Sequence, residues 1–221
     1  ITTKGNYSAS GFAKSIGSST IERCSSSVDL ESYRGSIAGF ALSISGSRIL
    51  KCYNTGNVKS DYEGYNEVSG FAGALSSSSY LIQCYAKCDV TGYKTVIGFC
   101  TDETTNMAGL IYDSYFIGNI QVTGDSVHDA DVFTGGHQLG MPMVYSSYVD
   151  ASITNSDKKE NDVRGDLYYN TDKLKFEEDE GIGLNTEQFK KKESFELFNF
   201  DYVWKWDDKE QRPRLLFEYE I

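Results

Sequence analysis

A ten-residue pattern recurs along the first two thirds of the chain, and this repeat constrains the fold more than any other feature. Its clearest copy reads Ile49-Leu50-Lys51-Cys52-Tyr53-Asn54-Thr55-Gly56-Asn57-Val58. The copies align on one anchor position, which is occupied by Cys24, Cys52, Cys84, Ser114 and Ser147. Successive anchors lie about 28 to 33 residues apart, a spacing typical of repeat architectures. The chain is therefore expected to fold as a stack of similar units.

The residue types around the anchor are the same from copy to copy. The position three residues before it is always apolar: Ile21, Ile49, Leu81, Ile111 and Val144. The position six residues after it is also always apolar: Leu30, Val58, Val90, Ile120 and Ile153. The alternation after the anchor predicts a strand whose even positions point inward and whose odd positions point outward. The apolar position three residues before the anchor does not fit this alternation. This mismatch predicts a bend just before the anchor.

A second block, built on glycine and phenylalanine, precedes each anchor. It reads Gly11-Phe12-Ala13, Gly39-Phe40-Ala41, Gly70-Phe71-Ala72, Gly98-Phe99-Cys100 and, more weakly, Val132-Phe133-Thr134. Serine-rich turns separate this block from the anchor. Each unit is therefore expected to hold about three short strands joined by turns.

One such unit cannot bury its own apolar face, but stacked units can, because their apolar columns become continuous ladders. We therefore predict an all-β fold for residues 1–156: a right-handed parallel β-solenoid, or β-helix, of about five coils. Residues 157–221 are expected to form a small α+β C-terminal cap over the unpaired edges of the last coil. Asn185, with Gln188 three residues later, signals the start of a helix in this cap. Trp204 and Trp206 are expected to belong to its core.

The repeats and the tail together resemble a known family. The Gly-Phe-Ala-Gly block and the Ile-x-x-Cys-Tyr-x-x-Gly-Asn-Val block look like the GLUG-motif repeats of bacterial cell-surface and secreted proteins. The tail, with Leu167-Tyr168-Tyr169, Gly181 to Phe189 and Arg212-Pro213-Arg214-Leu215, looks like the segment that closes such arrays. The resemblance implies an extracellular or surface location, a larger parent chain and an adhesive or other non-catalytic role. It implies no catalytic residues.

Composition excludes several function classes. The formal net charge is −11, and without a basic stripe such a chain is a poor match for nucleic acid. No apolar run approaches the ~20 residues that span a bilayer, so no membrane insertion is expected. The sequence begins at Ile1, which suggests a mature or excised fragment.

The cysteines are expected to be free, buried thiols. Their number is odd, five, which argues against a complete disulfide framework. Serine replaces cysteine at two anchors, so the column requires a small side chain rather than a bond. Cys84 and Cys88 have the spacing of a half zinc site, but no second pair or nearby histidine completes it. We expect no metal and no cofactor, and leave open a calcium site at the acidic loop 177–180, with Asp172 nearby.

The tyrosine column is the best candidate binding site. If Tyr53, Tyr85, Tyr115 and Tyr148 point outward, their rings form a ladder suited to a glycan or a host surface protein. The alternative is a structural stack packed against turns. We expect a non-catalytic module that serves in adhesion or as a rigid spacer.

The alternative from another class is a fragment of a glycan-cleaving β-helix enzyme that uses loop carboxylates. The candidate acids lie in two loops: Asp61, Glu63 and Glu67 in one, and Asp102 and Glu103 in the other. The two histidines, His128 and His137, are expected to lie in surface loops. Nucleophile-elbow, phosphate-loop and zinc-protease motifs do not occur.

Overall fold

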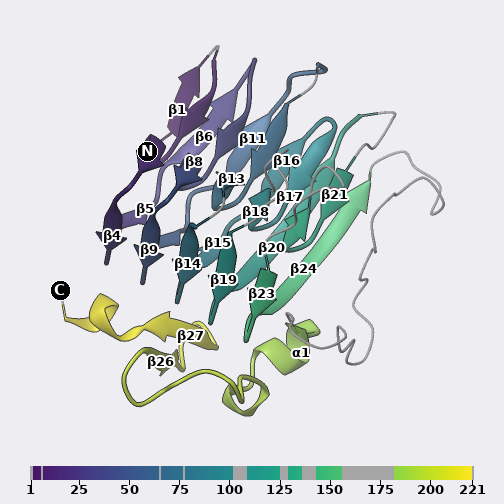
Figure 1. Cartoon of the computed structure of the whole chain (residues 1–221). Coiled ribbons are helices and arrows are strands. Elements are labelled where there is room, and N and C mark those ends of the chain that lie inside the picture. The colour runs from purple at the N-terminus through teal and green to yellow at the C-terminus, as the bar shows by residue number, and fades with distance from the viewer. Residues whose placement is uncertain are drawn as a thin grey trace.

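A computed structural model describes residues 2–5, 7–64, 66–76, 78–101, 109–124, 129–135, 143–155 and 182–220. The chain forms a parallel β-solenoid, as predicted, with the C-terminal part lying along one side (Figure 1). Equivalent strands of successive coils stack on one another in columns of five. From the first strand of a column to its last, the solenoid makes about four turns.

Each coil contains five short strands rather than the three expected. The first coil comprises β1 (Thr2–Gly5), β2 (Ala9–Ser10), β3 (Ala13–Gly17), β4 (Thr20–Glu22) and β5 (Ser25–Ser26). The second comprises β6 (Asp29–Ser32), β7 (Ile37–Ala38), β8 (Ala41–Ser45), β9 (Arg48–Leu50) and β10 (Tyr53–Asn54). The third comprises β11 (Val58–Ser60), β12 (Glu67–Ser69), β13 (Ala72–Leu75), β14 (Tyr80–Ile82) and β15 (Tyr85–Lys87).

In the later coils two strands merge into one long strand. The fourth coil comprises β16 (Val90–Gly92), β17 (Thr95–Ile97), β18 (Cys100–Thr101), β19 (Leu110–Tyr112) and the start of β20 (Tyr115–Val122). The fifth runs through the rest of β20, β21 (Asp129–Asp131), β22 (Thr134–Gly135), β23 (Met143–Tyr145) and into β24 (Tyr148–Asn155). Equivalent strands pair in parallel and in register, so Tyr53 pairs with Tyr85 and Tyr85 with Tyr115.

The core is a set of ladders that run along the coil axis. One ladder consists of Phe12, Phe40, Phe71, Phe99 and Phe133, whose rings stack with centroids 4.7–4.9 Å apart. The apolar columns of the repeat line the same core, and from the second coil onward every member whose side chain the structure describes is buried. The predicted inward positions are therefore confirmed.

The glycine column is imposed by the close approach of neighbouring coils. A Cβ added to Gly39 would lie 2.1 Å from the carbonyl oxygen of Gly70, and one added to Gly70 would lie 2.1 Å from that of Gly98. Backbone atoms cannot yield as a flexible side chain can. Val132 occupies this column in the last coil, where no described strand stacks beyond it. The weak fifth block thus reflects its place at the end of the stack.

The anchor column forms a thiol and hydroxyl ladder at a corner of the coil. The backbone N–H of Cys24 donates to Sγ of Cys52 (3.4 Å), and the N–H of Ser114 donates to Oγ of Ser147 (3.1 Å). Each anchor side chain donates in turn to the carbonyl two residues earlier, as Cys52 does to Leu50 (3.3 Å).

The residue before each anchor has a positive φ, between 47° and 58°, in Arg23, Lys51, Gln83, Asp113 and Ser146. The predicted bend is therefore confirmed. All five cysteines are free, and four of them are buried. Burial raises the pKa of Cys52 and of Cys88 to about 12.

A polar ladder follows on the outer surface. The N–H of Asn57 donates to Oδ1 of Asp29 (2.8 Å), that of Asp89 to Oδ1 of Asn57 (2.9 Å), and that of Asn119 to Oδ1 of Asp89 (3.0 Å). Aspartate and asparagine alternate, so a carboxylate accepts from the next coil without facing another carboxylate.

The C-terminal part, residues 182–220, is named the strap here. It contains β25 (Ile182–Gly183), α1 (Thr186–Phe189), two 3-10 turns (Lys192–Ser194 and Leu216–Tyr219) and the antiparallel hairpin β26 (Trp204–Asp207) and β27 (Arg212–Leu215). The predicted capping box is present: Asn185 accepts from the N–H of Gln188 (2.8 Å), and the Gln188 side chain accepts from the N–H of Asn185 (3.0 Å). The helix is a single turn that ends at Phe189, before Lys190.

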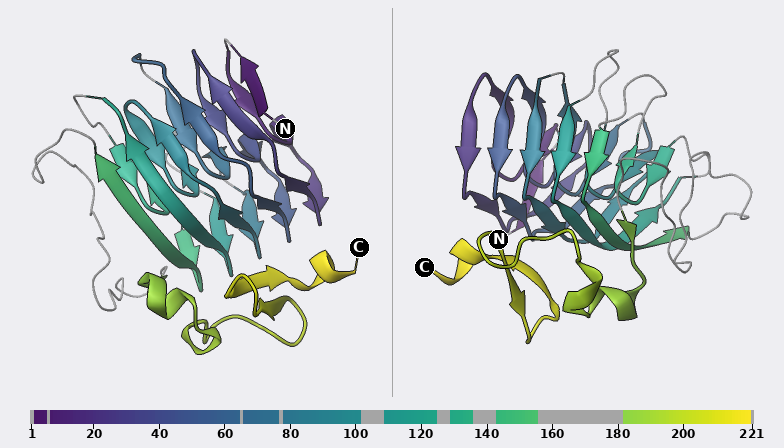
Figure 2. Two further views of the ribbon diagram at one scale, coloured as in Figure 1. Left: turned by 180° about the vertical axis from the view of Figure 1, so that it is seen from behind. Right: turned by 60° about the horizontal axis from the view of Figure 1, so that its bottom comes forward.

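The prediction of an end cap needs one correction. Only β25 extends the last coil, through its pairing with Tyr148 and Val149 of β24. The rest of the strap runs along the side of the solenoid, back toward the first coil (Figure 2). There Glu220 approaches Arg23 (Oε2 to Nη1, 3.7 Å), and the Arg23 guanidinium lies 5.9 Å from the Phe217 ring. The aromatic cluster therefore covers a side face rather than the end.

Candidate functional site

The tyrosine column lies on the outer side of the coil, as the alternation predicts. The rings of Tyr53, Tyr85 and Tyr115 stack with centroids 4.8 and 4.9 Å apart and nearly parallel planes. Tyr148 continues the register in the last coil. Tyr85, Tyr115 and Tyr148 belong to a hydrophobic cluster that is distinct from the coil core. We name these four side chains the tyrosine ladder.

The strap covers most of this ladder. Tyr85, Tyr115 and Tyr148 are at most 1% exposed, whereas Tyr53 is only partly buried. The side chains that cover them are aromatic residues of the strap: Phe189, Phe195, Phe198, Trp204 and Phe217. The binding hypothesis requires these rings to be exposed to a glycan or a host protein. The strap covers three of the four, so they do not form an open binding surface. Alternation identifies the outer side of a sheet but does not show what covers it.

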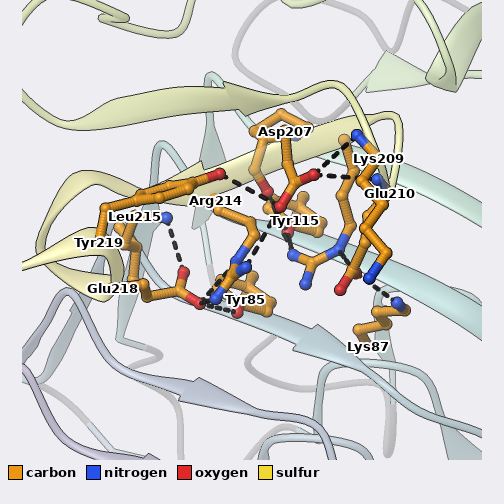
Figure 3. Close-up of polar contacts among 12 residues, drawn as sticks. Tyr85, Lys87, Tyr115, Asp207, Lys209, Glu210, Arg214, Leu215, Glu218 and Tyr219 are labelled. Carbon is orange, nitrogen blue, oxygen red and sulfur yellow. Dashed lines mark hydrogen bonds and ion pairs between the residues drawn. The ribbon is translucent and has the colours of Figure 1, made fainter. Parts of the chain in front are cut away.

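The phenol groups of Tyr85, Tyr115 and Tyr148 are hydrogen-bonded to the strap, and Figure 3 shows the contacts of Tyr85 and Tyr115. Tyr115 donates to the carbonyl of Pro213 (2.6 Å) and accepts from Nη1 of Arg212 (2.7 Å). Tyr85 donates to Oε2 of Glu218 (3.0 Å). Tyr148 accepts from the backbone N–H of Leu197 (3.0 Å). Each buried hydroxyl thus has a specific partner in the strap, which fixes the strap's position along the ladder.

Arg212 is the central polar residue of this contact. It is 4% exposed, and its guanidinium lies 5.1 Å from the centre of the Tyr85 ring. Its Nε donates to Oε2 of Glu210 (2.7 Å), and Glu210 also binds Nζ of Lys87 on the solenoid (2.6 Å). The hydrogen bond from Lys87, followed by that from Arg212, lowers the pKa of Glu210 to about 2. One strap carboxylate therefore links a strap arginine to a solenoid lysine.

A second set of charges stabilises the hairpin itself. Arg214 binds Oδ2 of Asp207 (3.2 Å) and Oε2 of Glu218 (2.9 Å). Oδ1 of Asp207 accepts from the backbone N–H groups of Lys209 and Glu210 (both 2.9 Å). The N–H donors, chiefly that of Glu210, and the Arg214 guanidinium lower the pKa of Asp207 to about 2. Burial raises the pKa of the Tyr85 and Tyr115 hydroxyls, which therefore stay protonated as donors.

Sequence reasoning missed the polar partners of the ladder: Lys87, Glu210, Arg212, Glu218 and the Pro213 carbonyl. The only signal was Arg212-Pro213-Arg214, two arginines within an acidic, aromatic segment. In the structure these residues form β27 of the strap hairpin. Its partners lie about a hundred residues away in sequence, so no local pattern reveals them.

The other candidate residues that the structure describes do not form a cluster of metal-ligating side chains. Asp61 pairs with Lys59 at the surface (3.0 Å), Glu63 is exposed, and Glu67 is partly buried in β12. The remaining candidates, Asp102, Glu103, His128, His137, Asp172 and the 177–180 loop, lie outside the described residues. Within the described ranges, no three His, Cys, Asp or Glu side chains are grouped as metal ligands.

One surface that the sequence did not suggest is apolar. It is the outer face of the sheet β4-β9-β14-β19-β23, here named the apolar face. In β9, β14, β19 and β23 the middle residue is buried and the two flanking residues point outward; in β4 the middle residue, Ile21, is only partly buried. The outward residues in the last four coils are Arg48, Leu50, Tyr80, Ile82, Leu110, Tyr112, Met143 and Tyr145. Apart from Glu22 in the first coil and Arg48 in the second, the strand residues of this face are uncharged, on a protein with a net charge of −11.

Comparison with protein-family models, with curated proteins and with solved structures gives no match. None of the described helices is long and apolar enough to cross a membrane.

Proposed function

We propose that this chain is a non-catalytic binding module of a larger bacterial surface or secreted protein, and that it binds a protein partner in adhesion. The observation that supports a binding role over a spacer role is the apolar face, an outer sheet surface on which Glu22 and Arg48 are the only charged side chains among the described strand residues. A spacer needs no such surface.

The apolar face is the described surface best suited to such a partner. Contiguous exposed apolar side chains on a soluble domain commonly mark interaction sites. A protein partner fits this face better than a glycan does. Four of its side chains are apolar and not aromatic: Leu50, Ile82, Leu110 and Met143. The rings of Tyr112 and Tyr145 stack on each other (4.8 Å), so their flat faces are turned toward one another rather than toward a sugar.

The test is a screen of host surface proteins and glycans with wild type and with the double variant Ile82→Ser/Tyr112→Ser. A matched control changes two outward residues elsewhere, Thr91→Ala/Gln121→Ala. We expect a protein to bind wild type and the control, and to bind the double variant at least tenfold more weakly, with unchanged thermal stability. Binding of a glycan alone, or binding that the double variant retains, would contradict the proposed partner.

The non-catalytic character is tested separately with a polysaccharide panel. We expect no cleavage by the wild-type chain. Turnover that disappears in Asp61→Asn or Glu63→Gln would establish the enzymatic alternative instead.

A further inference from the structure

The strap resembles a bound ligand more than a part of the solenoid. The coil core consists of residues from the solenoid alone, and the strap contributes to a second, separate cluster. The two clusters lie on opposite sides of the sheet that carries the tyrosine ladder. Removing the strap would therefore uncover the ladder without opening the coil core.

A long stretch of sequence also separates the strap from the solenoid. β24 ends at Asn155. Ile182 of the strap pairs with Tyr148, which lies roughly 23 Å back along the same strand. Residues 156–181 connect these two points, and that length of chain can span up to roughly 85 Å when extended. The connection is thus long enough for the strap to reach the ladder of a neighbouring molecule.

The contact has the selectivity of a recognition site. The guanidinium of Arg212 is aligned by the Tyr115 hydroxyl and by Glu210, while the Tyr85 ring lies beside it. Planar guanidinium groups combine directional hydrogen bonds with stacking on aromatic rings, which an ammonium group cannot do. All of these contacts would form unchanged if the strap came from another chain.

We propose that the tyrosine ladder is a recognition site for the Arg-Pro-Arg hairpin of the strap, and that a second copy of this chain can supply that hairpin. The result is a strap-exchanged pair of molecules, which is a form of domain swapping. The tethered strap competes at an effective concentration in the millimolar range. The strap-exchanged pair is therefore favoured over the closed monomer only where the chain's own strap or its own ladder is defective.

This condition defines the experiment. Full-length Arg212→Ala keeps an intact ladder but carries a defective strap. Full-length Tyr115→Ala keeps an intact strap but carries a defective ladder. When the two are mixed, the intact strap of one chain can occupy the intact ladder of the other. Native mass spectrometry distinguishes the heterodimer from either homodimer because the two variants differ in mass.

We expect each variant alone to be monomeric, with the emission of Trp204 shifted to the red by release of the strap. In the mixture we expect the emission to shift back toward that of wild type. We also expect at least ten times as much heterodimer as in a control mixture. The control pairs Asp208→Ala with Tyr202→Ala, two exposed positions of the strap. If Tyr115→Ala disturbs the coil, as judged by circular dichroism, Tyr115→Phe replaces it.

Two outcomes would overturn the proposal. One is a mixture with no more heterodimer than the control, although both variants release their own straps. The other is a single variant whose strap stays docked, because these contacts would then not carry recognition.

Discussion

The phenol of Tyr115 lies between two groups of the strap: it accepts a hydrogen bond from Arg212 (2.7 Å) and donates one to the carbonyl of Pro213 (2.6 Å). All three groups are buried. An outward side chain of the repeat has thus become the inner layer of a second core. The strap and the ladder must be considered together in any variant of either.

Replacement of Arg212 is expected to release the strap while the coil stays folded. Arg212→Ala leaves Glu210 and the Tyr115 hydroxyl without their partner, and loss of one partner of a buried ionic contact costs about 3 kcal/mol. Both tryptophans of the chain, Trp204 and Trp206, lie in the strap. The tryptophan emission of Arg212→Ala should therefore be shifted to the red before any urea is added, whereas its unfolding in urea followed by circular dichroism should still show the cooperative transition of the coil. Arg34→Ala, at an exposed position of the solenoid, serves as the control and should leave both the emission and the transition as in wild type.

Acid is expected to loosen the strap before it unfolds the solenoid. The pKa of Asp207 falls from 3.8 to about 2, and that of Glu210 from 4.5 to about 2. A carboxyl group whose pKa is lower in the folded state stabilises that state above its unfolded pKa, and the contribution is lost as the pH falls through the folded pKa. The strap should thus be fully docked above about pH 4.5 and weaken progressively toward pH 2.

The measurement is tryptophan emission during acid titration. The variant Asp207→Asn/Glu210→Gln removes both titrating groups, so its emission should change much less over this range. An identical acid transition in this variant and in wild type would show that other groups control docking.

The glycine column is expected to tolerate no side chain. In Gly39→Ala the added Cβ would meet the Gly70 carbonyl oxygen at 2.1 Å and Nδ2 of Asn54 at 2.2 Å. Because the coils must separate locally, we expect a loss of about 3 kcal/mol or more. Gly17→Ala is the matched control, since nothing lies within 4 Å of its added Cβ. That change should be neutral or stabilise by about 0.5 kcal/mol. Thermal unfolding of the two variants, compared side by side, checks both values; equal stability would contradict the role given to coil spacing.

At the anchor position, serine is expected to substitute for cysteine with little loss of stability, whereas valine is expected to destabilise the fold. Sγ of Cys52 accepts from the N–H of Cys24 and donates to the carbonyl of Leu50, and a serine hydroxyl can do both. Cys52→Ser should therefore change the free energy of unfolding by less than about 1 kcal/mol. Cys52→Val removes both bonds and should cost about 1–3 kcal/mol more than serine does. Chemical denaturation distinguishes the two, and a valine variant as stable as wild type would mean that the column requires only small volume.

Much of the solenoid could be predicted because its information is local and repeated. The anchor, the apolar columns and the glycine block recur at similar spacing, so errors in one copy are corrected by the others. Ser114 and Ser147 align with Cys84 as expected, and the bend before the anchor is confirmed by the positive φ of Lys51 and its equivalents.

The strap could not be predicted in the same way, because it occurs once. Its position depends on single contacts between residues far apart in sequence, such as Tyr85 with Glu218 and Tyr115 with Arg212. The cluster of aromatic residues correctly indicated a covering element. It did not indicate which surface is covered, since both the end of the stack and the tyrosine ladder present apolar groups.

The alternation of Asp29, Asn57, Asp89 and Asn119 has a consequence for how such an array can change its length. Deleting the coil that carries Asn57 would bring Asp29 and Asp89 into adjacent coils, with like charges about 4.8 Å apart. Deleting two adjacent coils would preserve the order of charged and neutral side chains. The interchangeable building block of this protein is therefore a pair of coils, and gain or loss of a single coil carries an electrostatic penalty.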